Sequence, residues 1–277
     1  MTQFNLNMLA TFQSLWQELI DEIVGYLQDD KISLLASSLT CRSLVPGCQK
    51  ALFSNLCVGS PSAPSGGLIV TNNLQRFLKM MEMVPHVAAY TKTLKLTLNF
   101  LEEALHERLV TQLASFHRLT HFSLHLIESP SYFVISPELK SSIQIILSLR
   151  TLEHLEVHDV LADILPQYTS IKHLVVHLWD FQSRIEVQPR TTPPRADGES
   201  SMAIESLDLH EVFGETNISL GIDYVLDTPT LNLSKLKRLQ IDIEGMEDYD
   251  QHTDISRLLQ ACTSIEVLRL ILSIYSE

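Results

Sequence analysis

The sequence has few of the features that mark secreted, membrane-spanning or nucleic-acid-binding proteins. Its four cysteines, Cys41, Cys48, Cys57 and Cys262, show neither paired metal-ligand spacing nor a dense disulfide framework. Twenty Lys and Arg residues against 33 Asp and Glu give a formal net charge of −13, which argues against nucleic acid as a partner. No apolar run reaches the ~18 residues of a membrane span, and no basic flank precedes a signal-like segment. We expect an intracellular protein, cytoplasmic or nuclear, with free thiols.

Motifs for catalysis are also missing. The chain has no Gly-rich phosphate loop, no nucleophile elbow and no HExxH zinc motif. Its close carboxylate pairs, such as Glu18 with Glu22, are better explained as solvated helix faces than as acid–base pairs. We therefore expect no enzymatic activity, no catalytic residues and no cofactor.

Hydrophobic residues make up 45% of the chain, which is enough for a sizeable core. The first apolar pattern, in residues 15–58, has helical spacing. Ser14 and Gln17 have the spacing of a capping box, and Asp29 or Asp30 can cap a second helix. Pro46 and Gly47 interrupt the apolar pattern that follows. Three short helices in about forty residues bury little surface alone and usually need a partner.

This segment contains the sequences ELIDEI, DDKISLL and TCRS. With them it resembles the F-box, especially in its fungal form, the motif that docks onto the Skp adaptor of cullin–RING ubiquitin ligases. The resemblance covers roughly the first sixty residues. It implies that the adaptor-binding residues are Leu15, Trp16, Leu19, Ile20, Ile23, Leu34, Leu35, Leu39, Cys41, Arg42 and Leu44. Two positions depart from the family pattern. Trp16 stands where Pro is usual, and Leu44 stands where Trp is usual.

After residues 60–72, which read as a linker containing SPSAPSGG, the chain repeats the pattern LxxLxL. Seven units begin at Thr91, Leu119, Leu152, Ile171, Ile204, Leu236 and Ile265. Helical patterns lie between several of them, so the strands should pair in parallel through crossovers. The prediction is a mixed α/β chain. An F-box module at 1–59 precedes an irregular leucine-rich-repeat solenoid with a curved parallel sheet at 73–277. No polar cap follows the last unit, which predicts an exposed sheet edge.

Alignment of the units places histidines at matching positions of neighbouring strands, on the predicted concave face. The candidate face for binding a target consists of His121, His125, His154, Glu156, His158, His173, His177, Asp208 and His210. Three interpretations are open: a polar surface that binds a protein, a pH-sensitive surface, or a metal site. A protein-binding surface is favoured, and no metal is expected because the ligands would form a flat ladder.

These features together predict a substrate-recognition subunit of an SCF-type ubiquitin ligase. The resemblance implies a Skp-type adaptor, and through it a cullin, as partners. The repeats would bind a protein substrate that the sequence does not identify. The alternative is a leucine-rich-repeat scaffold that binds proteins outside the ligase, with an F-box too altered to dock.

Overall fold

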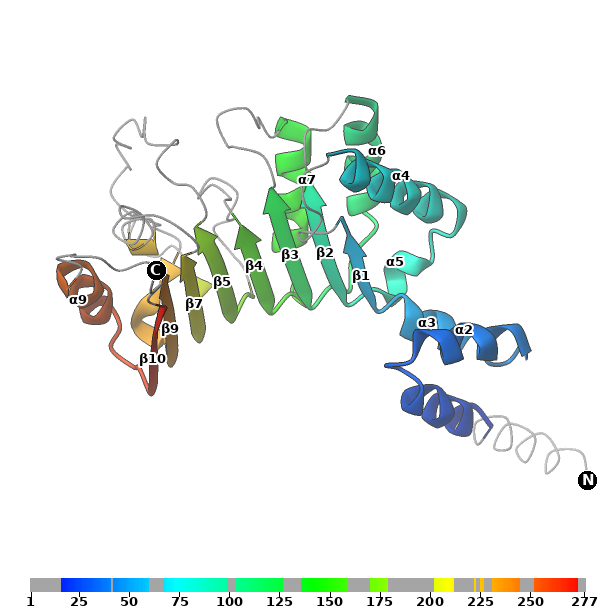
Figure 1. Cartoon of the computed structure of the whole chain (residues 1–277), viewed down its shortest axis with the longest axis horizontal. Coiled ribbons are helices and arrows are strands. Elements are labelled where there is room, and N and C mark those ends of the chain that lie inside the picture. Colours follow the sequence, from blue (N-terminus) through cyan, green and yellow to red (C-terminus); the bar gives the residue numbers. More distant parts are fainter. Residues whose placement is uncertain are drawn as a thin grey trace, which may run out of the picture.

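A computed structural model describes residues 16–40, 42–59, 67–98, 103–126, 136–158, 170–178, 202–211, 222, 225–226, 231–244 and 252–273. Within these ranges the chain has a mixed α/β fold built around an open, all-parallel sheet of eight strands (Figure 1). This confirms the fold class and the parallel pairing that the repeated pattern predicts.

The N-terminal part is helical. Residues 16–26 are followed by α2 (Lys31–Thr40) and α3 (Val45–Leu52). Asp30 begins α2 as predicted, because its Oδ1 accepts hydrogen bonds from the backbone N–H groups of Ile32 and Ser33, both at 3.1 Å. A hydrogen bond from the Ser33 hydroxyl, followed by these two backbone bonds, lowers the pKa of the Asp30 carboxyl. The segment has its own small core of Val24, Leu34 and Cys48, against which Ile20, Leu27 and Leu44 pack.

The main sheet has the strand order β1-β2-β3-β4-β5-β7-β9-β10. Its strands are β1 (Asn55–Val58), β2 (Thr93–Leu98), β3 (His121–Leu126), β4 (His154–His158), β5 (His173–Leu178), β7 (Ser206–Glu211), β9 (Arg238–Glu244) and β10 (Val267–Ser273). A second, two-stranded parallel sheet pairs β6 (Met202–Ala203) with β8 (Leu231–Asn232), and the short 3-10 helix η3 (Leu233–Lys235) follows β8.

The helices between the strands are α4 (Gly67–Met83), α5 (Val87–Tyr90), α6 (Glu103–Leu113), α7 (Pro137–Leu147) and α9 (His252–Ala261). Figure 1 shows α4, α6 and α7 gathered near β1–β3, and α9 near β9 and β10 at the other end of the sheet. The α4 helix begins at Gly67, six residues before residue 73, where the predicted linker was expected to end. Residues 67–72 of that predicted linker are therefore helical.

Each of the seven predicted units forms a strand, and the units join through a repeated backbone contact. The N–H groups of Thr120 and His121 both donate to the Lys92 carbonyl, at 2.8 and 3.0 Å. The same pair of bonds recurs where each later strand begins, for example from Glu153 and His154 to Thr120. The sheet also holds a strand that the pattern did not predict. The β1 strand lies at residues 55–58, inside the range expected for the helical module, and pairs with β2.

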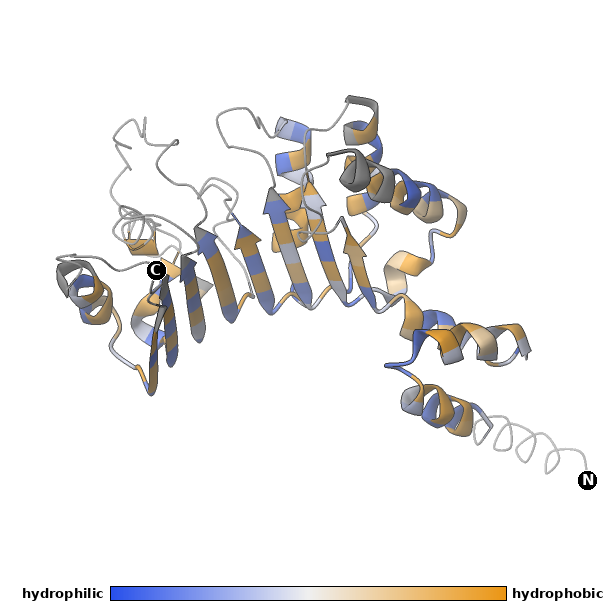
Figure 2. Ribbon diagram, in the orientation of Figure 1, coloured by the Kyte–Doolittle hydropathy of each residue, from blue (hydrophilic) through white to orange (hydrophobic). Residues whose placement is uncertain are grey.

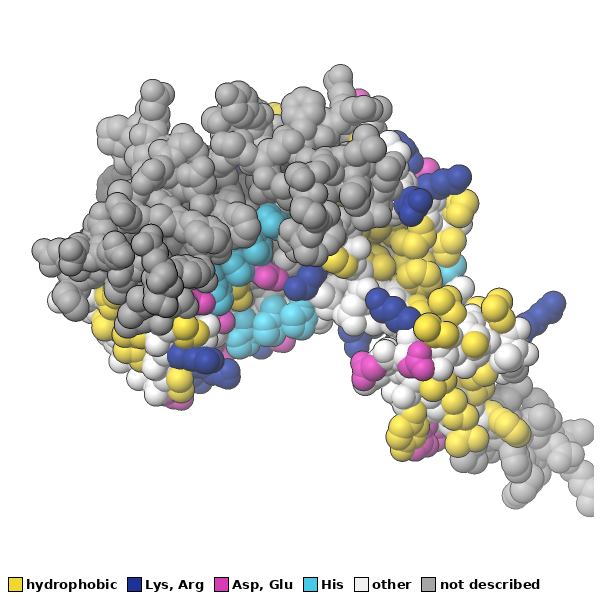
Figure 3. Space-filling view, in the orientation of Figure 1, with side chains coloured by type: hydrophobic (Ala, Val, Ile, Leu, Met, Phe, Trp, Pro, Cys, Tyr) yellow, Lys and Arg dark blue, Asp and Glu magenta, His cyan; other side chains and the backbone are white. Residues whose placement is uncertain are grey.

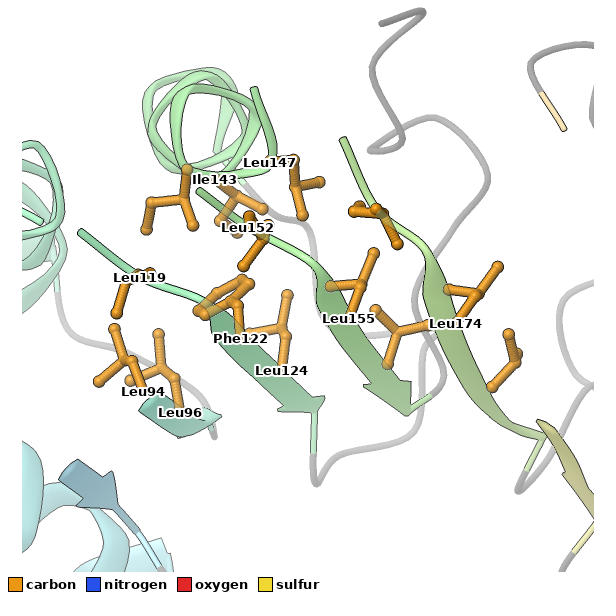
Figure 4. Packing of buried hydrophobic residues seen from close by; sticks show 14 of the residues in the cluster. Leu94, Leu96, Leu119, Phe122, Leu124, Ile143, Leu147, Leu152, Leu155 and Leu174 are labelled. Carbon is orange, nitrogen blue, oxygen red and sulfur yellow. The ribbon is translucent and has the colours of Figure 1, made fainter. Parts of the chain in front are cut away.

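The core lies on one face of the sheet. Hydrophobic and hydrophilic residues alternate along the strands (Figure 2), so one set of side chains packs against the helices. Figure 4 shows Leu119, Phe122, Leu152 and Leu155 of neighbouring units with Ile143 and Leu147 of α7. All six are buried. The opposite set of side chains forms the other face, which carries the histidines.

Among the described residues, β10 pairs only with β9, and it forms an edge of the sheet. Leu268 and Leu270 align with the buried Leu239 and Ile241 of β9, yet both remain exposed. The core-facing pattern therefore continues into β10 without the burial that the inner strands have.

Gly59 ends β1 in a conformation that other residues rarely adopt, with φ of 86°. A Cβ at this position would lie 2.7 Å from Thr97 Cβ and 3.0 Å from the Thr97 carbonyl oxygen. We expect Gly59→Ala to lower the free energy of unfolding by about 1–3 kcal/mol, measured by urea denaturation.

Gly25→Ala is the matched control for this substitution, because it adds the same methyl group. Gly25 is helical, and a Cβ there would meet no heavy atom within 4 Å. This change should stabilise its helix by about 0.5–1 kcal/mol. Equal stability of the Gly59→Ala chain and the unmodified chain would contradict this expectation, because it would mean that position 59 accommodates alanine without strain.

Candidate functional site

The register of the sheet gathers seven histidines into two rows on the face opposite the helices. His121, His154 and His173 are register partners on β3, β4 and β5, and we call them the first histidine row. The second histidine row is His125, His158, His177 and His210, on β3, β4, β5 and β7. Figure 3 shows both rows on one face of the molecule. The alignment of the repeats predicted this placement, whereas the binding role of the face stays a prediction.

The imidazole rings in each row stack on one another. In the first row the ring centroids of His121 and His154 are 4.0 Å apart, and those of His154 and His173 are 4.2 Å apart. In the second row the spacings are 4.4 Å for His125 and His158, 3.8 Å for His158 and His177, and 4.7 Å for His177 and His210. All five pairs are within 20° of parallel. The spacing of paired strands, ~4.8 Å, produces these stacks directly.

Glu156 lies between the two rows and contacts the second. Its Oε1 is 3.4 Å from Nε2 of His158 and 3.4 Å from Nε2 of His177. Its Oε2 is 3.3 Å from Lys95 Nζ. The imidazoles of His158 and His177, then the charge of Lys95, lower the pKa of the Glu156 carboxyl far below its usual value. Glu156 is therefore a carboxylate held in place by three neighbours.

Asp208, the other acidic residue of the predicted face, lies on β7 at the register position that Glu156 has on β4. Its register partners are Val175 of β5 and Gln240 of β9. Asp242 of β9 extends the second histidine row, since it is in register with His210 and its Oδ2 lies 3.5 Å from His210 Nδ1. Sequence reasoning missed Asp242, although the same alignment of LKRLQI with IESLDL places it directly opposite His210.

The environment of His121, His125 and His154 favours neutral imidazole, because the pKa of each ring is lowered. Burial, followed by the neighbouring His158 and His177, lowers the pKa of His125 to about 4, and Glu156 opposes this only partly. Burial is also the main cause that lowers the pKa of His121 and His154. Neutral rings can stack closely, whereas two protonated rings at this distance would repel each other.

The folded protein should accordingly lose stability as the pH falls below 6.5. Since the pKa of His125 is about 4 in the folded protein and ~6.5 in an unfolded chain, protons bind the unfolded chain preferentially between these values. The stabilisation that neutral His125 contributes is complete above pH ~6.5 and is lost as the pH falls toward about 4. We expect the free energy of unfolding, measured by urea denaturation, to fall by about 1–2 kcal/mol from pH 7 to pH 5.

The pH window from 7 to 5 separates this effect from carboxylate protonation, because carboxyl groups in unfolded chains titrate near ~4. Substitution of His121 and His125 by Asn should flatten the pH dependence in this window. An unmodified chain whose stability is constant or rises from pH 7 to pH 5 would contradict the assignment of neutral rings.

The N-terminal helices form a second candidate site. Trp16, Leu19, Ile23, Leu35 and Leu39, all predicted to contact the adaptor, are exposed. Ile20 and Leu44 are partly buried, and Arg42 is exposed. Leu15 and Cys41 lie outside the described residues. Figure 3 shows hydrophobic side chains at the surface of these helices. Clustered exposed apolar side chains are typical of interaction sites, so these residues are candidates for contact with a partner.

One predicted contact residue lies inside the module. Leu34 has no exposed surface, because it fills the small core between Val24 and Cys48. It supports the module from within, and its part in binding an adaptor stays a prediction. Two exposed apolar residues were missed, Tyr26 and Ile32. Leu27 and Leu34, close to them in sequence, face the core instead. The apolar pattern alone does not distinguish the core positions from the surface positions.

Comparison with known proteins leaves the family of this chain open: no protein-family model matches it, and no curated protein sequence matches it. Among the described residues, none of the helices combines the length and the apolar character that crossing a membrane requires. The three side chains in this part of the chain that could hold a metal ion together are Glu156, His158 and His177, whose ligand atoms lie within 4.8 Å of one another.

Proposed function

We propose that this chain is the substrate-recognition subunit of an SCF-type ubiquitin ligase. The observation that carries the proposal is the exposed apolar surface of the N-terminal helices, formed by Trp16, Leu19, Ile23, Leu35 and Leu39. The described part of this module has three fully buried apolar residues in its core, and so small a core favours a partner that covers the exposed surface. Together with the F-box-like order of residues, this favours a Skp-type adaptor as that partner.

The parallel sheet suits the second half of the proposal, in which the repeats form an irregular leucine-rich solenoid that binds a target protein. The histidine face offers polar and aromatic groups on a regular grid, and it carries both signs of charge in Lys95, Glu156 and Asp242. Such a surface suits a protein target, because interfaces combine stacking groups with directed hydrogen bonds.

In this role the chain performs no chemistry. It holds the target near a ubiquitin-charged enzyme, so that the rate increase comes from proximity. The adaptor connects the chain to a cullin, and the assembly would operate in the cytoplasm or the nucleus.

Co-expression of the intact chain with a Skp-type adaptor and a cullin tests the assembly. We expect the three proteins to elute together in size-exclusion chromatography, with the chain absent from the cullin fraction when the adaptor is omitted. Elution of the chain apart from the adaptor at micromolar concentration would reject the proposal and favour a scaffold that acts outside the ligase.

A further inference from the structure

Glu156, His158 and His177 bring together the ligand set of a transition-metal site. They come from the adjacent strands β4 and β5, and one ligand atom from each lies within 4.8 Å of the others. Two imidazole nitrogens and a carboxylate oxygen suit zinc and its neighbours in the first transition row. Calcium and magnesium are excluded as natural occupants because they prefer oxygen ligands alone.

The contacts of Glu156 Oε1 have the spacing of a coordination site. Its two distances to histidine nitrogen, both 3.4 Å, exceed the ~2.7–2.9 Å of a strong charge-assisted hydrogen bond. They equal the edge of a tetrahedron whose metal–ligand bonds are ~2.0–2.1 Å long, which is about 3.4 Å. An ion would convert these long contacts into short bonds.

Two further observations point to an occupant. Nε2 of His177 is buried and has no hydrogen-bond partner, because its 3.4 Å contact with Glu156 lacks hydrogen-bond geometry. A buried nitrogen without a partner is costly, and a bound ion is one way to satisfy it. Meanwhile Lys95 holds Glu156 Oε2, which leaves Oε1 facing the histidines as an outer-shell partner should.

Binding of an ion would require the stacked rings of His158 and His177 to rotate. His158 and His177 lie within 2° of parallel, and parallel planes 3.8 Å apart do not share an in-plane point. Each ring must turn about its Cβ–Cγ bond, a torsion whose preference is broad for histidine. Both side chains keep some exposed surface, so an ion can enter from solvent.

We propose that Glu156, His158 and His177 form a three-ligand site for a divalent transition-metal ion of the zinc class. Three protein ligands would leave the fourth position of a tetrahedral ion to water or another small ligand. The site stands independently of the ligase role, since it depends only on the sheet.

Isothermal titration calorimetry with zinc chloride on the intact, chelator-treated chain tests this site. We expect one saturable site per chain. The His158→Asn/His177→Asn variant should bind zinc at least ~100-fold more weakly, and Glu156→Gln at least ~10-fold more weakly. Far-ultraviolet circular dichroism must show that each variant keeps the secondary structure of the unmodified chain.

The matched control is His154→Asn/His173→Asn. It removes two stacked histidines from the same two strands, but from the first histidine row. Its zinc affinity should stay within ~3-fold of the unmodified chain. An equal loss in the control would mean adventitious binding by histidines in general and would overturn the proposal, as would the absence of saturable binding.

Discussion

Replacement of Leu19 and Leu35 by Asp is expected to weaken binding of a Skp-type adaptor by at least ~100-fold, measured by calorimetry. These side chains are 50% and 54% exposed in the free chain, on the first helix and on α2. A docked adaptor would bury them, and a carboxylate at either position would then lose its hydration without gaining a partner. The large effect comes from this desolvation added to the lost apolar contact.

The same exposure makes the experiment interpretable. Because neither leucine belongs to the core of Val24, Leu34 and Cys48, the double variant should keep its helix content and its unfolding midpoint. Ile145→Asp is the matched control, since Ile145 is 51% exposed on α7 and lies in the helices that cover the sheet. That variant should bind the adaptor as the unmodified chain does. Unchanged binding by the Leu19→Asp/Leu35→Asp chain would place the docking surface elsewhere.

The second large effect is expected in the core of the sheet. Leu155 of β4 is 1% exposed and packs within the continuous cluster that links the strands to α7. Leu155→Ala removes buried methyl groups and leaves a cavity, because neighbouring leucines held by their own strands relax only partly. We expect a loss of about 2–5 kcal/mol in the free energy of unfolding, measured by urea denaturation.

The repeat supplies its own control. Leu268 of β10 occupies the position equivalent to Leu155, through the register partners Leu174, Leu207 and Leu239. It is 44% exposed, so Leu268→Ala removes fewer contacts and should cost less than about 1 kcal/mol. Equal losses at both positions would mean that β10 is covered in solution as fully as the inner strands.

Much of the sheet could be predicted because its signal repeats. Alternating apolar residues such as those of LEHLEV, separated by helical patterns, indicate parallel strands, and the common register follows from aligning equivalent positions. The same alignment placed the seven histidines in rows. It left β1 undetected, because NLCV is four residues long and carries a single fully buried side chain, Val58.

Other features depend on contacts that a linear pattern does not contain. Leu34 and Leu35 are adjacent leucines on α2, yet one is in the core and the other at the surface, and only packing against Val24 and Cys48 separates them. The shared contact of Glu156 with two histidines depends on side-chain conformations across β4 and β5. Sequence alignment predicted that these residues are neighbours in a flat ladder, but it did not predict the shared contact.

The two departures from the F-box pattern would affect how tightly the module binds the proposed adaptor. Trp16 is exposed beside the surface of Leu19 and Ile23, and it offers a large apolar side chain to a partner. Leu44 instead packs against the module core, so its effect on docking would be indirect. Both positions keep apolar volume, and cores and interfaces tolerate such exchanges better than the introduction of charge.

Calorimetric titration of the intact chain with a purified Skp-type adaptor measures whether the chain docks as proposed. We expect a one-to-one complex with a Kd below ~1 μM, in the range of specific and stable assemblies. An absence of binding at adaptor concentrations of ~100 μM, with a chain whose helix content is intact, would contradict it.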